Sequence, residues 1–145
     1  MRYLTLAALL FAGAAHADNC VVDLKADDAM KFDKTEVTVS ASCATITINL
    51  AHVGKLPVTA MGHNVVISAT PDVAAIGTAG MNASAAANYV PAGDARVLAH
   101  TSLVGGGATT TATFPGSVLK AGGDYSFFCS FPGHWAIMKG KLTVQ

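Results

Sequence analysis

A cysteine, a histidine and a methionine lie close together near the end of the chain, at Cys129, His134 and Met138. Their side chains offer a thiolate, an imidazole and a thioether to a single ion. Thiolate and imidazole ligands with a weak thioether are the preferred set of a mononuclear copper site that transfers electrons. The spacing therefore predicts a copper site, which needs a second imidazole from another part of the chain.

The second imidazole has three candidates, His52, His63 and His100. We favour His63 because it lies in the sequence Met-Gly-His-Asn, directly before the apolar run Val65–Ile67. The preceding Gly62 has no side chain to obstruct its own carbonyl. That oxygen can therefore approach the ion as a second, weak axial ligand.

Other chemistry matches these residues less well. Structural zinc prefers four strong ligands and rarely accepts methionine. A cysteine–histidine nucleophile pair needs an orienting Asn or Asp and leaves Met138 without a role. Taken singly, Cys129 and Met138 would be ordinary core residues and His134 a surface residue. Their order and spacing favour the metal site.

The elements that must position these residues are short strands. Apolar residues alternate with polar ones, or form brief runs, in about eight segments. These are Val22–Leu24, Val37–Val39, Ile46–Leu50, Val65–Ile67, Val97–Leu98, Thr109–Phe114, Tyr125–Cys129 and Leu142–Val144. Glycine- and proline-containing turns separate them. The pattern predicts a mainly β fold, a Greek-key sandwich or barrel of about eight strands.

One alanine-rich segment has no period of two and predicts a helix from about Pro71 to Ser84. Thr70 is a good N-cap, Pro71 suits the first helical position, and Asp72 is favourable in the first turn. This helix would form a flap inserted between two strands.

The predicted fold brings the ligands together, because the loops of a sandwich gather at its two ends. Cys129 is expected at the end of an aromatic strand, with His134 and Met138 in the loop that follows. The Pro-Gly pair ending at Gly133 turns that loop. His63 would open a neighbouring strand at the same end.

The composition indicates one folded domain. The chain has 145 residues, of which 52% are hydrophobic and 12% charged, and its formal net charge is zero. This balance excludes a disordered chain. It also argues against nucleic acid as a partner, since binding nucleic acid needs a basic surface.

The first residues have the pattern of a secretory signal peptide. Arg2 is a short positive region, Leu4–Ala12 is an apolar run, and Ala-His-Ala ending at Ala17 is a cleavage signal. The run is well short of the roughly 20 residues that span a bilayer. We expect a signal peptide over residues 1–17, no membrane anchor after its cleavage, and a single copper-binding domain over residues 18–145.

Export leads to an oxidising compartment, in which disulfides persist. Cys20 and Cys43 both lie beside strand-like runs, and closing that loop would stabilise the fold by roughly 3 kcal/mol. Three cysteines allow three pairings, so spacing alone leaves the pairing open.

The chain from Asp18 onward resembles the azurins, small bacterial blue copper proteins of the cupredoxin class. The matching stretches are Met-Gly-His-Asn (61–64), Val-Leu-Ala-His-Thr (97–101), Phe-Phe-Cys (127–129), Phe-Pro-Gly-His (131–134), Met-Lys-Gly (138–140) and the pair Cys20 and Cys43. The spacing from Cys129 to His134 is discriminating, because plastocyanin-like and amicyanin-like relatives have fewer residues there.

This resemblance implies a copper ion in a trigonal plane formed by His63, Cys129 and His134. Met138 and the Gly62 carbonyl would be distant axial partners. It also implies a Greek-key sandwich with a helical flap.

The resemblance further implies a Cys20–Cys43 disulfide and a soluble periplasmic electron shuttle, which cycles between Cu(I) and Cu(II). Its partners would be other redox proteins, such as c-type cytochromes or periplasmic reductases and dehydrogenases, docking transiently onto a monomer. Such a carrier is not an enzyme.

Supporting residues can be assigned from the same resemblance. Asn64 would tie two ligand loops together, and backbone N–H groups near Phe131 would point at the thiolate sulfur. An apolar docking patch is expected around His134. It comprises Met30, Leu56, Met61, Met81, Phe131, Pro132, Ala136 and Ile137, enlarged by Trp135.

Two positions depart from the azurins. They commonly bury a tryptophan where this chain has Val65, and the only tryptophan here is Trp135, beside His134. We expect a core repacked around valine and a partly exposed Trp135 near the metal end.

The second departure follows His52, where this chain has Val53 and azurins frequently have a proline. In relatives this histidine is sometimes linked to pH-dependent behaviour, but we favour a structural role for it.

Two other functions would use the same metal. A copper-enzyme subunit would need a second metal site, with further histidines and a much longer chain. A copper storage or delivery protein would favour several exposed methionines or cysteines over one enclosed mixed site. Electron transfer is therefore the preferred interpretation.

Overall fold

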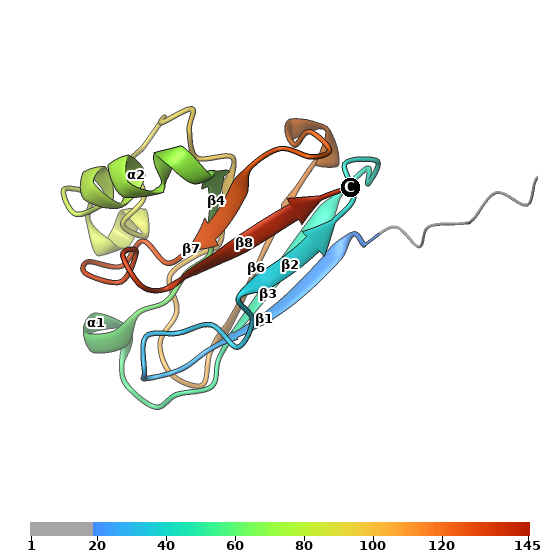
Figure 1. Ribbon diagram of the computed structural model, residues 1–145. Helices are drawn as coiled ribbons and strands as arrows, with labels where there is room; N and C mark the ends of the chain where they lie inside the picture. Colours follow the sequence, from blue (N-terminus) through green and yellow to red (C-terminus); the bar gives the residue numbers. More distant parts are fainter. Residues whose placement is uncertain (1–18) are drawn as a thin grey trace, which may run out of the picture.

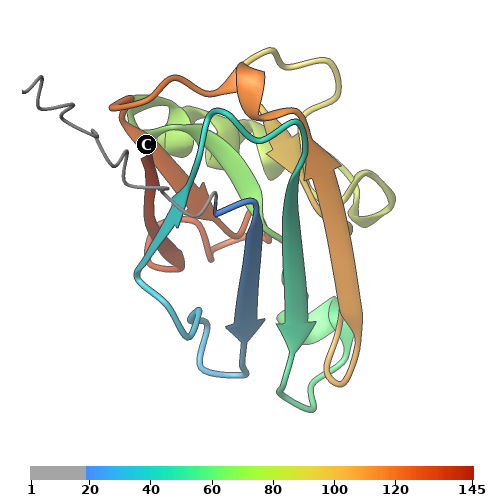
Figure 2. The same cartoon turned by 90° about the vertical axis from the view of Figure 1, so that its right-hand side faces the viewer.

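The protein is described by a computed structural model over residues 19–145, which form two packed β-sheets (Figures 1 and 2). The predicted signal peptide over residues 1–17 lies outside the described residues. The smaller sheet has the order β1 (Val21–Ala26), β3 (Ile46–His52), β6 (Thr109–Phe114). The larger sheet has the order β2 (Glu36–Val39), β8 (Lys139–Val144), β7 (Tyr125–Phe128), β4 (Val66–Ala69), β5 (Ala99–His100).

The strands pair in a mixed pattern. β1 lies parallel to β3 and β2 parallel to β8, whereas the other neighbours are antiparallel. The prediction of a mainly β sandwich with about eight strands and a short helical flap is confirmed. Several strand boundaries differ from the prediction by one to three residues. The strand expected at Val97–Leu98, for example, begins two residues later, as β5.

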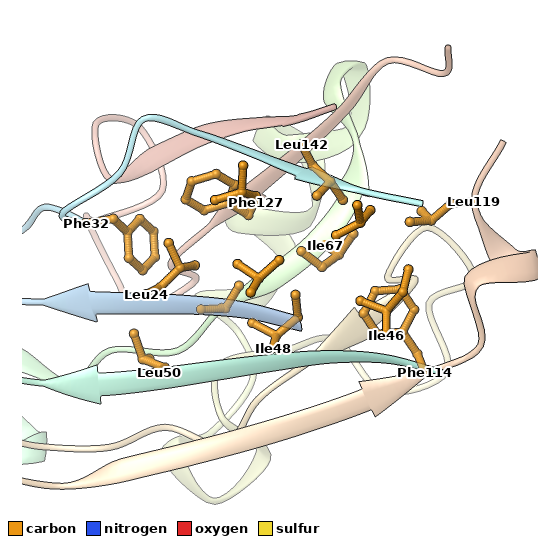
Figure 3. Close-up of a cluster of buried hydrophobic side chains, with 14 of the residues drawn as sticks. Leu24, Phe32, Ile46, Ile48, Leu50, Ile67, Phe114, Leu119, Phe127 and Leu142 are labelled. Carbon is orange, nitrogen blue, oxygen red and sulfur yellow. The ribbon is translucent and has the colours of Figure 1, made fainter. Parts of the chain in front are cut away.

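Alternating residues of the strands fill the space between the sheets. In β3 the buried positions are Ile46, Ile48, Leu50 and His52. The apolar members of this row meet residues such as Phe127 from the larger sheet in one cluster (Figure 3). His52 is the last residue of this row, so the core at that end of β3 ends in a buried imidazole rather than an apolar side chain.

The flap is more broken than predicted, and its α-helix is shorter. It consists of a 3-10 turn (Thr70–Asp72), helix α2 (Val73–Gly80) and a second 3-10 turn (Ala85–Ala87). The prediction of one helix from Pro71 to Ser84 is therefore wrong at both ends. Thr70 does not cap the helix, because its hydroxyl pairs with Ser126 Oγ at 2.9 Å across the sheet. Glycines within α2 further weaken helix propensity.

Helix α2 covers the outer face of the larger sheet (Figure 1). Val73 and Ile76 of the helix pack with Val66 of β4 and Phe128 of β7 in a second apolar cluster. β4 is thus buried on both faces. That burial explains why its sequence is a continuous apolar run rather than an alternating one. None of the helices within residues 19–145 is long and apolar enough to cross a bilayer.

The disulfide implied by the resemblance is present. Cys20 and Cys43 are bonded, with a Cα–Cα distance of 5.7 Å, and Cys129 is a buried free thiol. The bridge joins the chain before β1 to the chain before β3, at the far end of these parallel strands from His52. Val65, around which we expect the core to be repacked, is buried in the same cluster as Phe127.

Candidate metal centre

The candidate ligands come from the ends of two paired strands. β4 and β7 are antiparallel, with Val66 opposite Phe128, so the start of β4 and the end of β7 lie side by side. His63 shortly precedes β4, and Cys129 directly follows β7. The register of one strand pair therefore brings together residues that are far apart in the sequence.

The loop that carries the other two candidates is closed by its own backbone. The Cys129 N–H donates to the Met138 carbonyl at 3.0 Å, and the Met138 N–H donates to the His134 carbonyl at 2.8 Å. Gly133 has a φ of 84°, a left-handed conformation that favours glycine. The Pro-Gly pair thus turns the chain so that His134 and Met138 return toward Cys129.

The sulfur lies at the distance from each imidazole that a trigonal site requires, and the three donor atoms all lie within 4.8 Å of one another. Cys129 Sγ lies 3.7 Å from His63 Nδ1 and 3.6 Å from His134 Nδ1. The Gly62 carbonyl oxygen lies 3.8 Å from the same sulfur. Three donors about 2.1 Å from a central ion and 120° apart would be about 3.6 Å from one another. The residues present therefore fit one copper ion.

The cluster is enclosed by protein. Cys129 and His63 have an exposed fraction of 0%, His134 of 3% and Met138 of 1%. His63, Cys129 and His134 form the one group of His, Cys, Asp and Glu side chains within residues 19–145 that is close enough to share an ion. Burial of this kind keeps water from the ion and limits movement of the ligands.

A backbone contact sets the orientation of His63. Its Nε2–H donates to the Asp27 carbonyl oxygen at 2.8 Å. This bond leaves the lone pair on Nδ1 directed toward the sulfur of Cys129. A hydrogen bond from the second ring nitrogen is the usual way in which proteins hold a metal-binding imidazole.

Burial also controls the protonation of the ligands. It lowers the pKa of His134 to about 4, with the nearby His63 as a further cause, and it lowers the pKa of His63. Burial raises the pKa of the Cys129 thiol to about 11. At neutral pH both imidazoles are therefore neutral and ready to bind metal, whereas the thiol keeps its proton until a metal replaces it.

Polar groups around the sulfur oppose this effect of burial. The backbone N–H groups of Asn64 and Phe131 bond to Cys129 and lower the pKa of its thiol. The Asn64 side chain also bridges to the ligand loop, where Oδ1 accepts from the Ser130 N–H at 2.9 Å and Nδ2 donates to Ser130 Oγ at 2.8 Å. The structure thus places both predicted supporting residues beside Cys129.

The other two histidine candidates lie outside the cluster. His52 is buried, its Nε2–H donates to the Met61 carbonyl at 2.8 Å, and its Nδ1 accepts from the Gly54 N–H at 3.1 Å. His100 is exposed and its Nδ1 lies 3.0 Å from the Thr101 carbonyl. Both ring nitrogens of His52 are occupied, which fits the structural role that we favoured.

The predicted docking residues differ in exposure. Helices α1 (Val58–Met61) and α2 lie at the same end of the molecule as the loop before β8 (Figure 1). Exposed members of the predicted patch are Leu56, Met81, Ala136 and Ile137, and half-buried members are Met30, Met61, Phe131, Pro132 and Trp135. Val53 and Val58, which the prediction omitted, are also exposed.

Sequence reasoning missed several residues around the cluster. Asp27 was missed because only its backbone carbonyl contacts His63, and no side-chain pattern reveals that. Ser130 and Asn88, which both bond to Asn64, were missed as well. One local pattern could have drawn attention to Asn88, because an asparagine just after a helical turn often adopts the left-handed conformation.

The comparisons with known proteins agree with the geometry. The family model described as "Copper binding proteins, plastocyanin/azurin family" matches residues 18–145. The azurin of Alcaligenes faecalis is 54% identical over 125 residues, covering 86% of this chain and 98% of that protein. The azurin of Bordetella pertussis is 49% identical over 134 residues, covering 92% of this chain and 89% of that protein.

A solved structure is similar in three dimensions. The azurin Az-iso2 of the obligate methylotroph Methylomonas sp. strain J has a TM-score of 0.83 and 39% sequence identity. The match covers 87% of this chain and 98% of that chain.

Proposed function

The chain belongs to the plastocyanin/azurin family of copper-binding proteins, and on that premise we propose a periplasmic electron carrier whose copper is held by His63, Cys129 and His134. The observation that carries the ligand assignment is the enclosed cluster, in which one thiol sulfur faces two imidazole Nδ1 atoms at 3.6 and 3.7 Å. Met138 and the Gly62 carbonyl are proposed as the weak axial ligands.

The bound copper supplies a one-electron couple between Cu(I) and Cu(II). The protein's part is to keep the same ligand positions in both oxidation states. The bond from His63 to Asp27, the bridge from Asn64 to Ser130 and the closed loop from Cys129 to Met138 all restrain those positions. Small movement of the ligands on electron transfer favours rapid exchange with a partner.

The partners that we propose are other redox proteins, such as c-type cytochromes or periplasmic reductases and dehydrogenases. The exposed apolar side chains of Leu56, Met81 and Ile137 support brief docking of this kind to a monomer.

The cluster is suited to moving electrons rather than to converting a bound substrate, so we propose that the protein is not itself an enzyme. Copper storage or delivery and a role as a copper-enzyme subunit are less favoured, given the azurin relatives.

The copper assignment is tested by the absorption spectrum of the purified Cu(II) protein. We expect an intense blue band from thiolate-to-copper charge transfer, and we expect Cys129→Ser to lack it. A colourless copper complex of the unsubstituted protein would refute the assignment.

Fractionation of cells that express the full chain tests the compartment. The expected result is a periplasmic product that begins at Asp18.

A further inference from the structure

Asn88 has an unusual backbone conformation at the end of the flap. It follows the 3-10 turn Ala85–Ala87, with a φ of 58° and a ψ of 21°, and the next residue, Tyr89, has a φ of 53°. Two successive left-handed residues that are not glycine are costly, and such strain is kept where surrounding contacts require it. The contacts of Asn88 show what this conformation achieves.

The backbone carbonyl of Asn88 joins the neighbours of two ligands. It accepts a hydrogen bond from Asn64 Nδ2 at 2.8 Å and another from Ser130 Oγ at 3.2 Å. Asn64 directly follows His63, and Ser130 directly follows Cys129. Both donor residues have an exposed fraction of 0%. A displaced Asn88 carbonyl would therefore leave one N–H of the buried Asn64 amide and the buried Ser130 hydroxyl without this acceptor.

The side chain of Asn88 holds a third segment. Its Oδ1 accepts from the Leu103 N–H at 2.8 Å. The next residue, Val104, exchanges two backbone hydrogen bonds with His63, each 2.9 Å long. The Leu103 side chain also covers Gly62, since a Cβ on that glycine would lie 3.0 Å from Leu103 Cγ.

From these contacts we propose that Asn88 is a positioning residue of the metal centre. Its carbonyl and its amide oxygen together bind the segments that hold His63, Cys129 and the Gly62 carbonyl. The end of the helical flap thereby sets the distances between the ligands, although no flap residue is a ligand. This inference rests on the proposed copper site, and it adds a residue remote in sequence from every ligand.

The decisive variants are Asn88→Gly and Asn88→Asp. Glycine accepts the left-handed backbone but lacks the acceptor for the Leu103 N–H and loosens the carbonyl. Aspartate keeps a side-chain oxygen at the same place and also tolerates this conformation. Asn82→Gly, at an exposed position of the same flap, is the matched control.

The metal-free protein provides the first readout. Amide hydrogen exchange at Leu103 and Ser130 should become at least about tenfold faster in Asn88→Gly than in Asn82→Gly, and it should return toward the unsubstituted rate in Asn88→Asp. Equal exchange rates in Asn88→Gly and Asn82→Gly would overturn the proposal. This readout needs no copper, so it is decided separately from the proposed function.

The copper-loaded protein provides a second readout that a merely structural role would not move. Asn88→Gly should shift the reduction potential, change the copper hyperfine splitting in the electron paramagnetic resonance spectrum, and release copper to a chelator several-fold faster. If Asn88→Gly lowered only the unfolding temperature and left all three unchanged, Asn88 would be a folding residue and the proposal would be wrong. A missing blue band in the unsubstituted protein would instead refute the proposed function.

Discussion

The indole of Trp135 lies directly over Gly77 of helix α2. A Cβ on Gly77 would overlap Trp135 Cγ and would lie 2.6 Å from Cδ1, so one of the two would have to move. Gly77 is buried, and Trp135 is half-buried in the cluster beneath the helix. Because Trp135 directly follows His134, this contact packs the ligand loop against the flap.

We predict that Gly77→Ala destabilises the protein by about 1–3 kcal/mol, since the added methyl group displaces the indole. Alanine would otherwise favour the helix by about 1 kcal/mol. Denaturant unfolding of the metal-free protein measures the difference. In a Trp135→Ser background the same substitution should be neutral or stabilising. A penalty that persists in that background would show that the indole is not its cause.

The fluorescence of Trp135 should report on the metal. The ring is half-buried and adjacent to His134, so we expect emission between that of a core tryptophan and that of a fully exposed one. Cu(II) should quench this emission, and removal of copper should restore it. Strongly blue-shifted emission that is insensitive to copper would contradict the placement of the ring. The chain has one tryptophan, so the signal needs no deconvolution.

Loss of the disulfide should reduce stability without changing the colour of the protein. Cys20 and Cys43 are separated by 23 positions, and opening a loop of that size costs roughly 3 kcal/mol. The bridge lies at the other end of β1 and β3 from His52, whose ring lies 4.5 Å from the His63 ring, centroid to centroid. A Cys20→Ser, Cys43→Ser double variant should therefore unfold at lower denaturant concentration and keep the blue band. Loss of the band in the folded variant would show coupling between the two ends.

Copper uptake should release about one proton at neutral pH, because the metal replaces the proton of a thiol. Burial raises the pKa of Cys129 to about 11, whereas His134, with a pKa of about 4, has no proton to lose. Calorimetric titration in buffers of different ionisation enthalpy counts the protons. The count should not change between pH 7 and pH 8. A count near zero at pH 7 would mean that the free sulfur is already a thiolate.

The metal-free protein should lose stability in weak acid. The pKa values of His134 and His63 are lowered in the folded state, so below about pH 6.5 the unfolded chain binds more protons. Stability therefore falls as the pH drops from about 6.5 to about 4, with His134 contributing about 3 kcal/mol at most. Unfolding free energies at several pH values measure the slope. His134→Gln should make the slope shallower, and an equal slope in that variant would contradict the assignment.

Local patterns in the sequence predicted a large part of the site. Cys129, His134 and Met138 lie in one loop, whose turn depends on neighbouring residues alone and on the left-handed Gly133. A strand with one buried face was equally predictable, as the alternation of Ile46, Ile48 and Leu50 in β3 shows. The flap was predicted less well, because its ends are decided by contacts such as that between Thr70 and Ser126 rather than by helix propensity.

The sequence by itself thus determined the kinds of ligand, the turn that groups three of them and the β-rich fold, since all of these follow from short-range geometry. The sequence favoured His63 among three candidate histidines, and the tertiary structure decided that its ring faces Cys129. His63 lies beside it because β4 and β7 are antiparallel, whereas His52 is turned to the Met61 carbonyl. The position of Trp135 over a helical glycine was likewise decided by packing. Such contacts join residues far apart in the chain, and no local pattern encodes them.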